Sequence, residues 1–245
     1  MNQTPQPQTA WGSIALHLIP GALLTAVYFA IAPAVMKAGY PPLMALLLCI
    51  LVILIPVELG ILFYQGRKLN GRWSLEGIVL NRERIPLWQY FVLVPLLLIW
   101  ASLPFLLFSP VDNYLLRTFF AWMPAWATTG ISVASVAQYS HGAFLATVVL
   151  AFLLNGILGP VVEELYFRGY LLPRIPASRS WTPLINVLLF SLYHLFSPWQ
   201  NITRIVALIP LVYVVSWKRN LYLSMITHCL LNTLGMLSLL ALAMR

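Results

Sequence analysis

The chain has 245 residues, of which 61% are hydrophobic and only 8% are charged, and its mean hydropathy is +0.87. A soluble domain is typically about a quarter charged, so six acidic and fourteen basic residues cannot solvate a globule of this size. Intrinsic disorder is excluded for the opposite reason, because disordered chains are poor in apolar residues. The composition therefore indicates a membrane protein with several spans.

The net charge of +8 does not indicate a nucleic-acid partner, because no basic run is longer than two residues and the bases lie between apolar blocks. Cys49 and Cys229 both fall inside apolar stretches, which argues against a disulfide framework. The polar start lacks Lys and Arg, and the apolar block behind it is longer than a signal-peptide core, so we expect the first span to be retained.

Seven apolar blocks have roughly the 20 residues that a helix needs to cross a hydrocarbon core about 30 Å thick. They are residues 12–36, 41–64, 87–108, 143–172, 182–199, 202–217 and 221–244. The sixth block is the weakest, because Pro210 lies in its middle. The stretch 109–142 is not polar enough for an ordinary loop, and its aromatic segment 119–127, FFAWMPAWA, predicts an external helix lying in the membrane interface. The sequence thus predicts an all-α transmembrane bundle of about seven spans plus one interfacial helix.

Lysine and arginine are unevenly divided between alternate connections, and the richer side of a membrane protein is normally cytoplasmic. One side collects Arg67, Lys68, Arg72, Arg82, Arg84, Arg168, Arg174, Arg179, Lys218 and Arg219, and the other has Lys37, Arg117, Arg204 and Arg245. This distribution predicts a cytoplasmic N terminus and an external C terminus.

A few polar side chains fall within the apolar blocks, where a charge costs a few kcal/mol and is a functional candidate by default. They are Glu58, Glu163, Glu164, Arg168, His194, His228, Asn232 and, near the start of the first block, His17.

The most informative of these groups lie in the stretch EELYFR at 163–168. Glu164 and Arg168 are four residues apart and can form an ion pair on one helix face. Adjacent residues point about 100° apart, so Glu163 is left free to meet another helix. The alternative is a juxtamembrane ion pair with a spare glutamate.

Two histidines occur in the stretches FSLYH at 190–194 and HCLLN at 228–232. A single intramembrane histidine is more often a packing residue than a catalytic one. Measured from the predicted cytoplasmic helix ends, however, Glu163, His194 and His228 lie about 14, 18 and 11 Å deep at 1.5 Å per residue. Three helices would therefore place a carboxylate and two imidazoles in one layer, open to the cytoplasm through a cavity.

This set of side chains suits the hydrolysis of an amide bond. A carboxylate beside an imidazole can take a proton from water, and a second imidazole with an amide can hold the oxyanion that forms when the water attacks a carbonyl. No Ser or Cys is paired with an activating base in a recognised motif, so we expect direct attack by water.

In these motifs and in their order the sequence resembles the CPBP family, the CAAX proteases and bacteriocin-processing or immunity proteins. EELYFR, FSLYH and HCLLN fit the family's EExxxR, FxxxH and HxxxN elements. The resemblance covers about 143–244 and implies a catalytic core at 143–245 behind an N-terminal membrane region at 1–142. It also implies residue roles: water activation by Glu163 and His194, oxyanion binding by His228 and Asn232, and support from Glu164, Arg168 and Phe190.

The metal requirement stays open, because Glu163, His194 and His228 could also form a His₂Glu zinc site. The sequence has no HExxH motif, and we favour a metal-free, glutamate-dependent reaction without a cofactor.

The main hypothesis is an intramembrane endopeptidase that cuts a lipidated or membrane-inserted substrate near the cytoplasmic surface, with the bilayer and a peptide as its partners. A second is a non-catalytic immunity or scaffold protein. A third is a small transporter with Glu58, Glu163 and the histidines as a proton relay, although no paired inverted halves are evident. Glu58 is more simply a solvated or hydrogen-bonded group near the cytoplasmic end of the second span.

Overall fold

The computed structural model describes residues 7–128 and 138–243. Within these ranges the chain is helical apart from its turns and one isolated β-bridge between Arg82 and Asn220. The predicted all-α class is therefore confirmed.

Most of the elements are α-helices, and several are continued by π-helical or 3₁₀ turns. The α-helices are α1 (Ala10–Lys37), α2 (Pro42–Cys49), α3 (Ile55–Asn70), α4 (Leu87–Leu107), α5 (Ser109–Phe119), α6 (Ala125–Thr128), α8 (His141–Leu150), α9 (Gly159–Glu163), α10 (Thr182–Tyr193), α11 (Asn201–Lys218) and α12 (Leu221–Ala243). The π-helical segments are η1 (Ile50–Leu54), η2 (Ala151–Leu158) and η3 (Glu164–Leu171), and the 3₁₀ turns are η4 (Leu172–Arg174) and η5 (Pro198–Gln200).

Five helical stretches of the described chain are long and apolar enough to cross a membrane. They are Ala10–Lys37, Pro42–Asn70, Leu87–Leu107, His141–Arg174 and Pro198–Lys218, and shorter apolar helices cover Thr182–Tyr193 and Leu221–Leu237. The chain is thus a multi-pass membrane protein, but the predicted number of seven spans is not confirmed.

The fifth predicted span, 182–199, is much shorter as a helix than expected. The helix α10 ends at Tyr193 after 12 residues, about 18 Å at 1.5 Å per residue, which is too short for a hydrocarbon core. His194, directly after the helix, already has a non-helical ψ of 56°, and Pro198 further disfavours helical geometry at Ser197. The sixth block, expected to be the weakest, instead begins earlier than predicted and accommodates Pro210 inside α11.

The predicted interfacial helix at 119–127 is also wrong as a continuous element. The helix α5 ends at Phe119, and α6 begins only at Ala125, after a turn that contains Pro124. The ring of Trp126 packs at 5.5 Å from Tyr28 on α1, measured between centroids. The part of this region at 129–137 lies outside the described residues.

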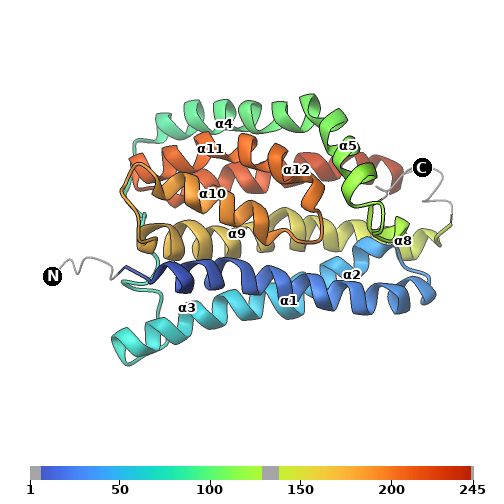
Figure 1. Cartoon of the computed structure of the whole chain (residues 1–245), viewed down its shortest axis with the longest axis horizontal. Coiled ribbons are helices and arrows are strands. Elements are labelled where there is room, and N and C mark those ends of the chain that lie inside the picture. The colour runs from blue at the N-terminus through green and yellow to red at the C-terminus, as the bar shows by residue number, and fades with distance from the viewer. Residues whose placement is uncertain (1–6, 129–137, 244–245) are drawn as a thin grey trace.

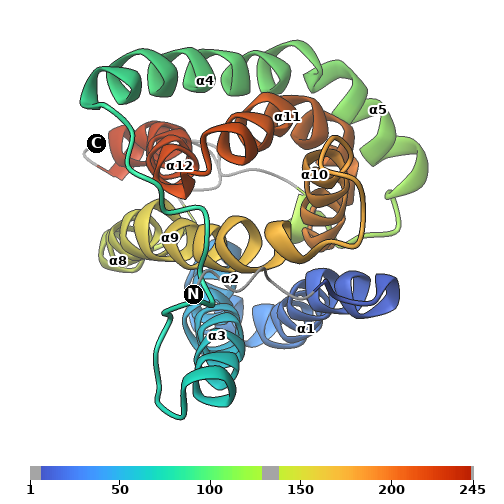
Figure 2. The same cartoon turned by 90° about the vertical axis from the view of Figure 1, so that its left-hand side faces the viewer.

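Most of the basic connections lie at one end of the bundle. Figure 1 shows the start of α1, the loop after α3, the loop before α10 and the α11–α12 junction at its left-hand end, and Figure 2 views that end. Backbone hydrogen bonds join them, from Gln8 to Arg174 (2.9 Å) and from Glu83 to Arg219 (3.0 Å). Three bases that were assigned to connections, Arg168, Arg174 and Arg204, are instead buried. The cytoplasmic placement of the N terminus stays a prediction.

One hydrophobic core holds the helices together and draws on both halves of the chain, for example Leu24 and Leu47 with Val187 and Leu211. The helix α4 packs against α11 and α12, whereas its outer face carries exposed apolar residues such as Phe91 (79% exposed). Such an outer face suits lipid, not water.

The close approach of α1 to the end of α10 depends on Gly21. A Cβ atom there would overlap the carbonyl oxygen of Tyr193. We therefore expect Gly21→Ala to lower the free energy of unfolding by about 1–3 kcal/mol, as overpacking does, measured by thermal unfolding in detergent. Gly60→Ala is the matched control, because a Cβ at Gly60 meets nothing within 4 Å. Equal melting temperatures of the two variants would contradict the close packing.

Candidate active site

The four side chains that the sequence singled out for chemistry line one cavity. Glu163 at the end of α9, His194 after α10, and His228 and Asn232 on α12 all border a space of about 310 Å³. Ligand pockets of proteins begin at about this size. The structure thus brings together polar groups that are up to 69 residues apart in the sequence.

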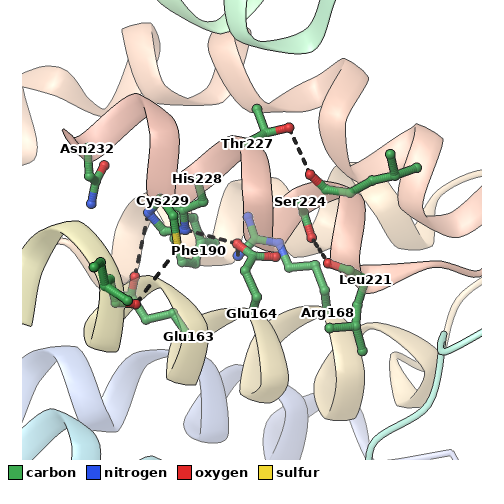
Figure 3. A network of polar contacts seen from close by, with 12 residues as sticks. Glu163, Glu164, Arg168, Phe190, Leu221, Ser224, Thr227, His228, Cys229 and Asn232 are labelled. Carbon is green, nitrogen blue, oxygen red and sulfur yellow. Dashed lines mark hydrogen bonds and ion pairs between the residues drawn. The ribbon is translucent and has the colours of Figure 1, made fainter. Parts of the chain in front are cut away.

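The glutamate pair stands at the junction of α9 and η3. Arg168 Nη1 lies 3.3 Å from Glu164 Oε1, and both side chains are fully buried. The predicted ion pair is therefore present. Glu163 points to α12 instead (Figure 3), as expected for adjacent residues of a helix.

His228 lies between the two glutamates. Its Nδ1 is 3.0 Å from Glu164 Oε1, and its Nε2 is 3.8 Å from Glu163 Oε2, both drawn in Figure 3. A carboxylate oxygen accepts, so Nδ1–H is the donor to Glu164 and the ring orientation is set by that bond. The separation from Glu163 exceeds a direct hydrogen bond and is one that a water molecule can bridge.

His194 is held by the backbone at the end of α10. Its Nδ1 lies 2.9 Å from the carbonyl oxygen of Phe190. A carbonyl oxygen can only accept, so Nδ1 carries the proton, and in the neutral ring Nε2 is left with the lone pair. A histidine fixed in this tautomer is suited to act as a base through Nε2.

The aromatic ring of Phe190 connects the charged and imidazole groups. Its centroid lies 4.0 Å from Arg168 Cζ, and its ring makes edge contacts with His194 at 4.9 Å and His228 at 6.2 Å. A cation over a ring face is attracted by the ring quadrupole. Phe190 therefore helps to fix Arg168 and both histidines at once.

Asn232 is anchored to the other wall of the cavity. Its Nδ2 donates a 2.8 Å hydrogen bond to the carbonyl oxygen of Asn155, which lies in η2. An amide nitrogen has two hydrogens, so a second donor remains for a ligand.

Three further polar residues belong to this region; the sequence analysis placed Glu58 with the site residues only in the alternative proton relay, and it gave Tyr193 and Arg204 no place there. Tyr193 lines the cavity and donates a 3.2 Å hydrogen bond to Glu58 Oε1. Glu58 is fully buried on α3, so of the two expectations for it, the hydrogen-bonded one holds and the solvated one is wrong. Arg204 also lines the cavity. The place of Tyr193 directly before His194 could have indicated that it belongs to the site. Nothing in the sequence around Arg204 distinguishes it from a basic residue of a connection between spans.

His17 lies apart from the cavity and has a packing role. Its Nδ1 donates to the carbonyl oxygen of Ser13 at 2.7 Å, and its Nε2 accepts from Asn186 Nδ2 at 3.1 Å. Both ring nitrogens are thus used within the buried core.

The zinc alternative finds no preformed ligand set. Over the residues that the structure describes, no three His, Cys, Asp or Glu side chains are grouped so that they could hold a metal ion. Glu163, His194 and His228 share the cavity wall, and the metal independence of the site stays a prediction.

Comparison with known proteins supports the resemblance seen in the motifs. Residues 145–234 match the family model described as Type II CAAX prenyl endopeptidase Rce1-like. All four cavity residues fall within this range, and the match confirms the CAAX protease resemblance of this part of the chain. No curated protein and no solved structure matches the chain.

The buried Glu164–Arg168 pair makes a stability prediction. We expect Arg168→Met to lower the free energy of unfolding by about 3–5 kcal/mol, because Glu164 would be left as an uncompensated buried charge. The double variant Glu164→Gln with Arg168→Met should recover most of the loss. Arg72→Met is the matched control, since its pair with Glu76 is largely exposed. A single variant as stable as the control in thermal unfolding would contradict the assigned pair.

Proposed function

Because residues 145–234 match the Rce1-like type II CAAX prenyl endopeptidase family, we propose that this protein is an intramembrane endopeptidase. Its substrate is a lipidated or membrane-associated peptide, cut near the cytoplasmic face. The observation that carries the proposal is the cavity that Glu163, His194, His228 and Asn232 line together. These are the positions of the family's three motifs.

In the first step, a water molecule is held in the cavity between Glu163 and His194. The Glu163 carboxylate or His194 Nε2 takes a proton from the water as its oxygen attacks the carbonyl carbon of the scissile bond. The tautomer of His194, set by its bond to Phe190, leaves Nε2 available for this role.

The tetrahedral intermediate then carries a negative oxygen, which needs hydrogen-bond donors. The second Nδ2–H of Asn232 is one donor. Nε2–H of His228 is the other, and because Nδ1–H already bonds Glu164, this requires the imidazolium form of the ring. Glu164 and Glu163 stabilise that positive charge.

In the last step the carbon–nitrogen bond breaks, and the proton taken from water passes to the departing amine. The products are a new carboxylate and a new amino terminus. Glu164, Arg168 and Phe190 do not touch the substrate in this scheme, and they position His228 and His194.

We place the N terminus and the opening of the cavity on the cytoplasmic side. The support for this orientation is the concentration of Lys and Arg in the connections at one end of the bundle.

The proposal predicts that the general base is essential. Glu163→Gln and His194→Ala should each reduce kcat for cleavage of a membrane-peptide library by about 10²–10⁴-fold, the typical worth of acid–base catalysis. Purified variants in lipid are compared with wild type, and Glu76→Gln, an exposed glutamate outside the cavity, is the control. Unchanged cleavage in both variants would refute the assigned site. Cleavage by no variant, wild type included, would favour the non-catalytic immunity or scaffold role.

Metal independence makes a separate prediction. Cleavage by wild type should be indifferent to a zinc chelator and to added zinc, because the proposed water is activated by side chains alone. The measurement is initial rate before chelation, after chelation and after zinc is restored. A rate that falls with the chelator and returns with zinc would assign Glu163, His194 and His228 to a metal instead.

A further inference from the structure

Arg204 is a buried cation in the wall of the same cavity. It lies in the first turns of α11, is 8% exposed and lines the cavity together with Glu163 and His194. Its guanidinium holds the turn between α10 and α11, with hydrogen bonds from Nη2 to Ser197 Oγ (2.9 Å) and from Nη1 to Asn201 Oδ1 (3.0 Å).

All the hydrogen-bond acceptors recorded around this guanidinium are neutral. Besides Ser197 and Asn201, it reaches the carbonyl oxygen of Ser191 at 3.4 Å, and it forms no ion pair with a described residue. The charges of Glu163 and Asp112 act on Arg204, but neither carboxylate forms an ion pair with it, and Asp112 Oδ1 already accepts from the hydroxyl of Thr203 at 2.6 Å. A buried cation without a direct ion pair is costly, so the arginine is suited to receive an anion from the cavity.

We propose that Arg204 binds the C-terminal carboxylate of the substrate. This inference rests on the proposed function and names the kind of peptide that the site accepts. A guanidinium presents parallel N–H donors that match a carboxylate in a bidentate pair.

The dimensions of the site favour a chain end over an internal loop. Arg204 and Glu163 border one cavity of about 310 Å³, so a carboxylate at the arginine leaves space for only a short peptide up to the bond at Glu163. The far side of the Arg204 turn is covered by α5, through the Asp112–Thr203 hydrogen bond and the contact of Phe120 with Trp199 at 6.3 Å. A peptide that continued past Arg204 would meet this packed wall.

The test uses two peptides of one sequence, one with a free C-terminal carboxylate and one with a C-terminal amide. Wild type in lipid should cleave the acid with a kcat/KM about 10- to 100-fold higher, which corresponds to a charge-assisted hydrogen bond. Arg204→Gln should remove this preference by slowing cleavage of the acid alone, and Arg204→Lys should restore part of it. Arg174→Gln is the matched control, because Arg174 is also buried but bonds the carbonyl oxygens of Tyr170 and Gly77 away from the cavity.

Three results would overturn the inference while leaving the proposed function intact, provided that Glu163→Gln is inactive on both peptides. They are equal cleavage of acid and amide by wild type, an equal loss on both peptides in Arg204→Gln, and loss of the preference in Arg174→Gln. An equal loss of cleavage on both peptides would mean that Arg204 only stabilises the α10–α11 turn.

If wild type cleaves neither peptide, the proposed function fails. Carboxylate recognition by Arg204 is then tested by measuring peptide binding. The affinity of the acid and of the amide for purified wild type and Arg204→Gln is then measured by calorimetry in detergent. Tighter binding of the acid that disappears in the variant would support carboxylate recognition, and equal affinities would refute it.

Discussion

The cost of burying charge in a membrane protein is the constraint on which this structure depends. Glu164, Arg168 and His228 are tolerated inside the bundle because each neutralises or hydrogen-bonds another: Arg168 and His228 both meet the same oxygen, Glu164 Oε1. The energetic requirement to pair these groups also fixes their geometry. The contacts that offset the cost of burying Glu164 therefore also orient His228. They leave Glu163 outside the Glu164–Arg168 ion pair, at the wall of the cavity.

The short helix α10 is the second determinant of the site. Because it ends at Tyr193, the chain turns inside the bundle, and His194 follows the helix end with its Nδ1 on the carbonyl of Phe190. A full-length helix would have satisfied that carbonyl with backbone and filled the space with side chains. The cavity thus exists where a spanning helix is absent, and irregular backbone at such depth is tolerated because it lies within protein or lines a polar space.

The sequence predicted which polar groups lie together better than it predicted the topology. The pairing of Glu164 with Arg168 follows from helical spacing alone, and the meeting of Glu163, His194 and His228 follows from their polarity in apolar surroundings. Helix lengths could not be predicted as well, because the residues after Tyr193 stay apolar although the backbone leaves the helix at His194. Arg204 was misassigned for a related reason. A basic residue near a helix end is normally taken as part of a connection outside the membrane, and its burial is seen only once the α10–α11 turn is folded around it.

The cavity combines two kinds of polar group on opposite sides of the α10–α11 turn. Before the turn, His194 faces Glu163 and the motif residues of the family-matched segment. After it, Arg204 shares a wall with neutral acceptors and is backed by α5, which belongs to the first half of the chain. The family match begins at residue 145, so Arg204 lies within the matched segment, whereas α5, which packs behind it through the Asp112–Thr203 hydrogen bond, lies outside that segment. The proposed carboxylate site therefore needs both the matched segment and a helix from the first half of the chain.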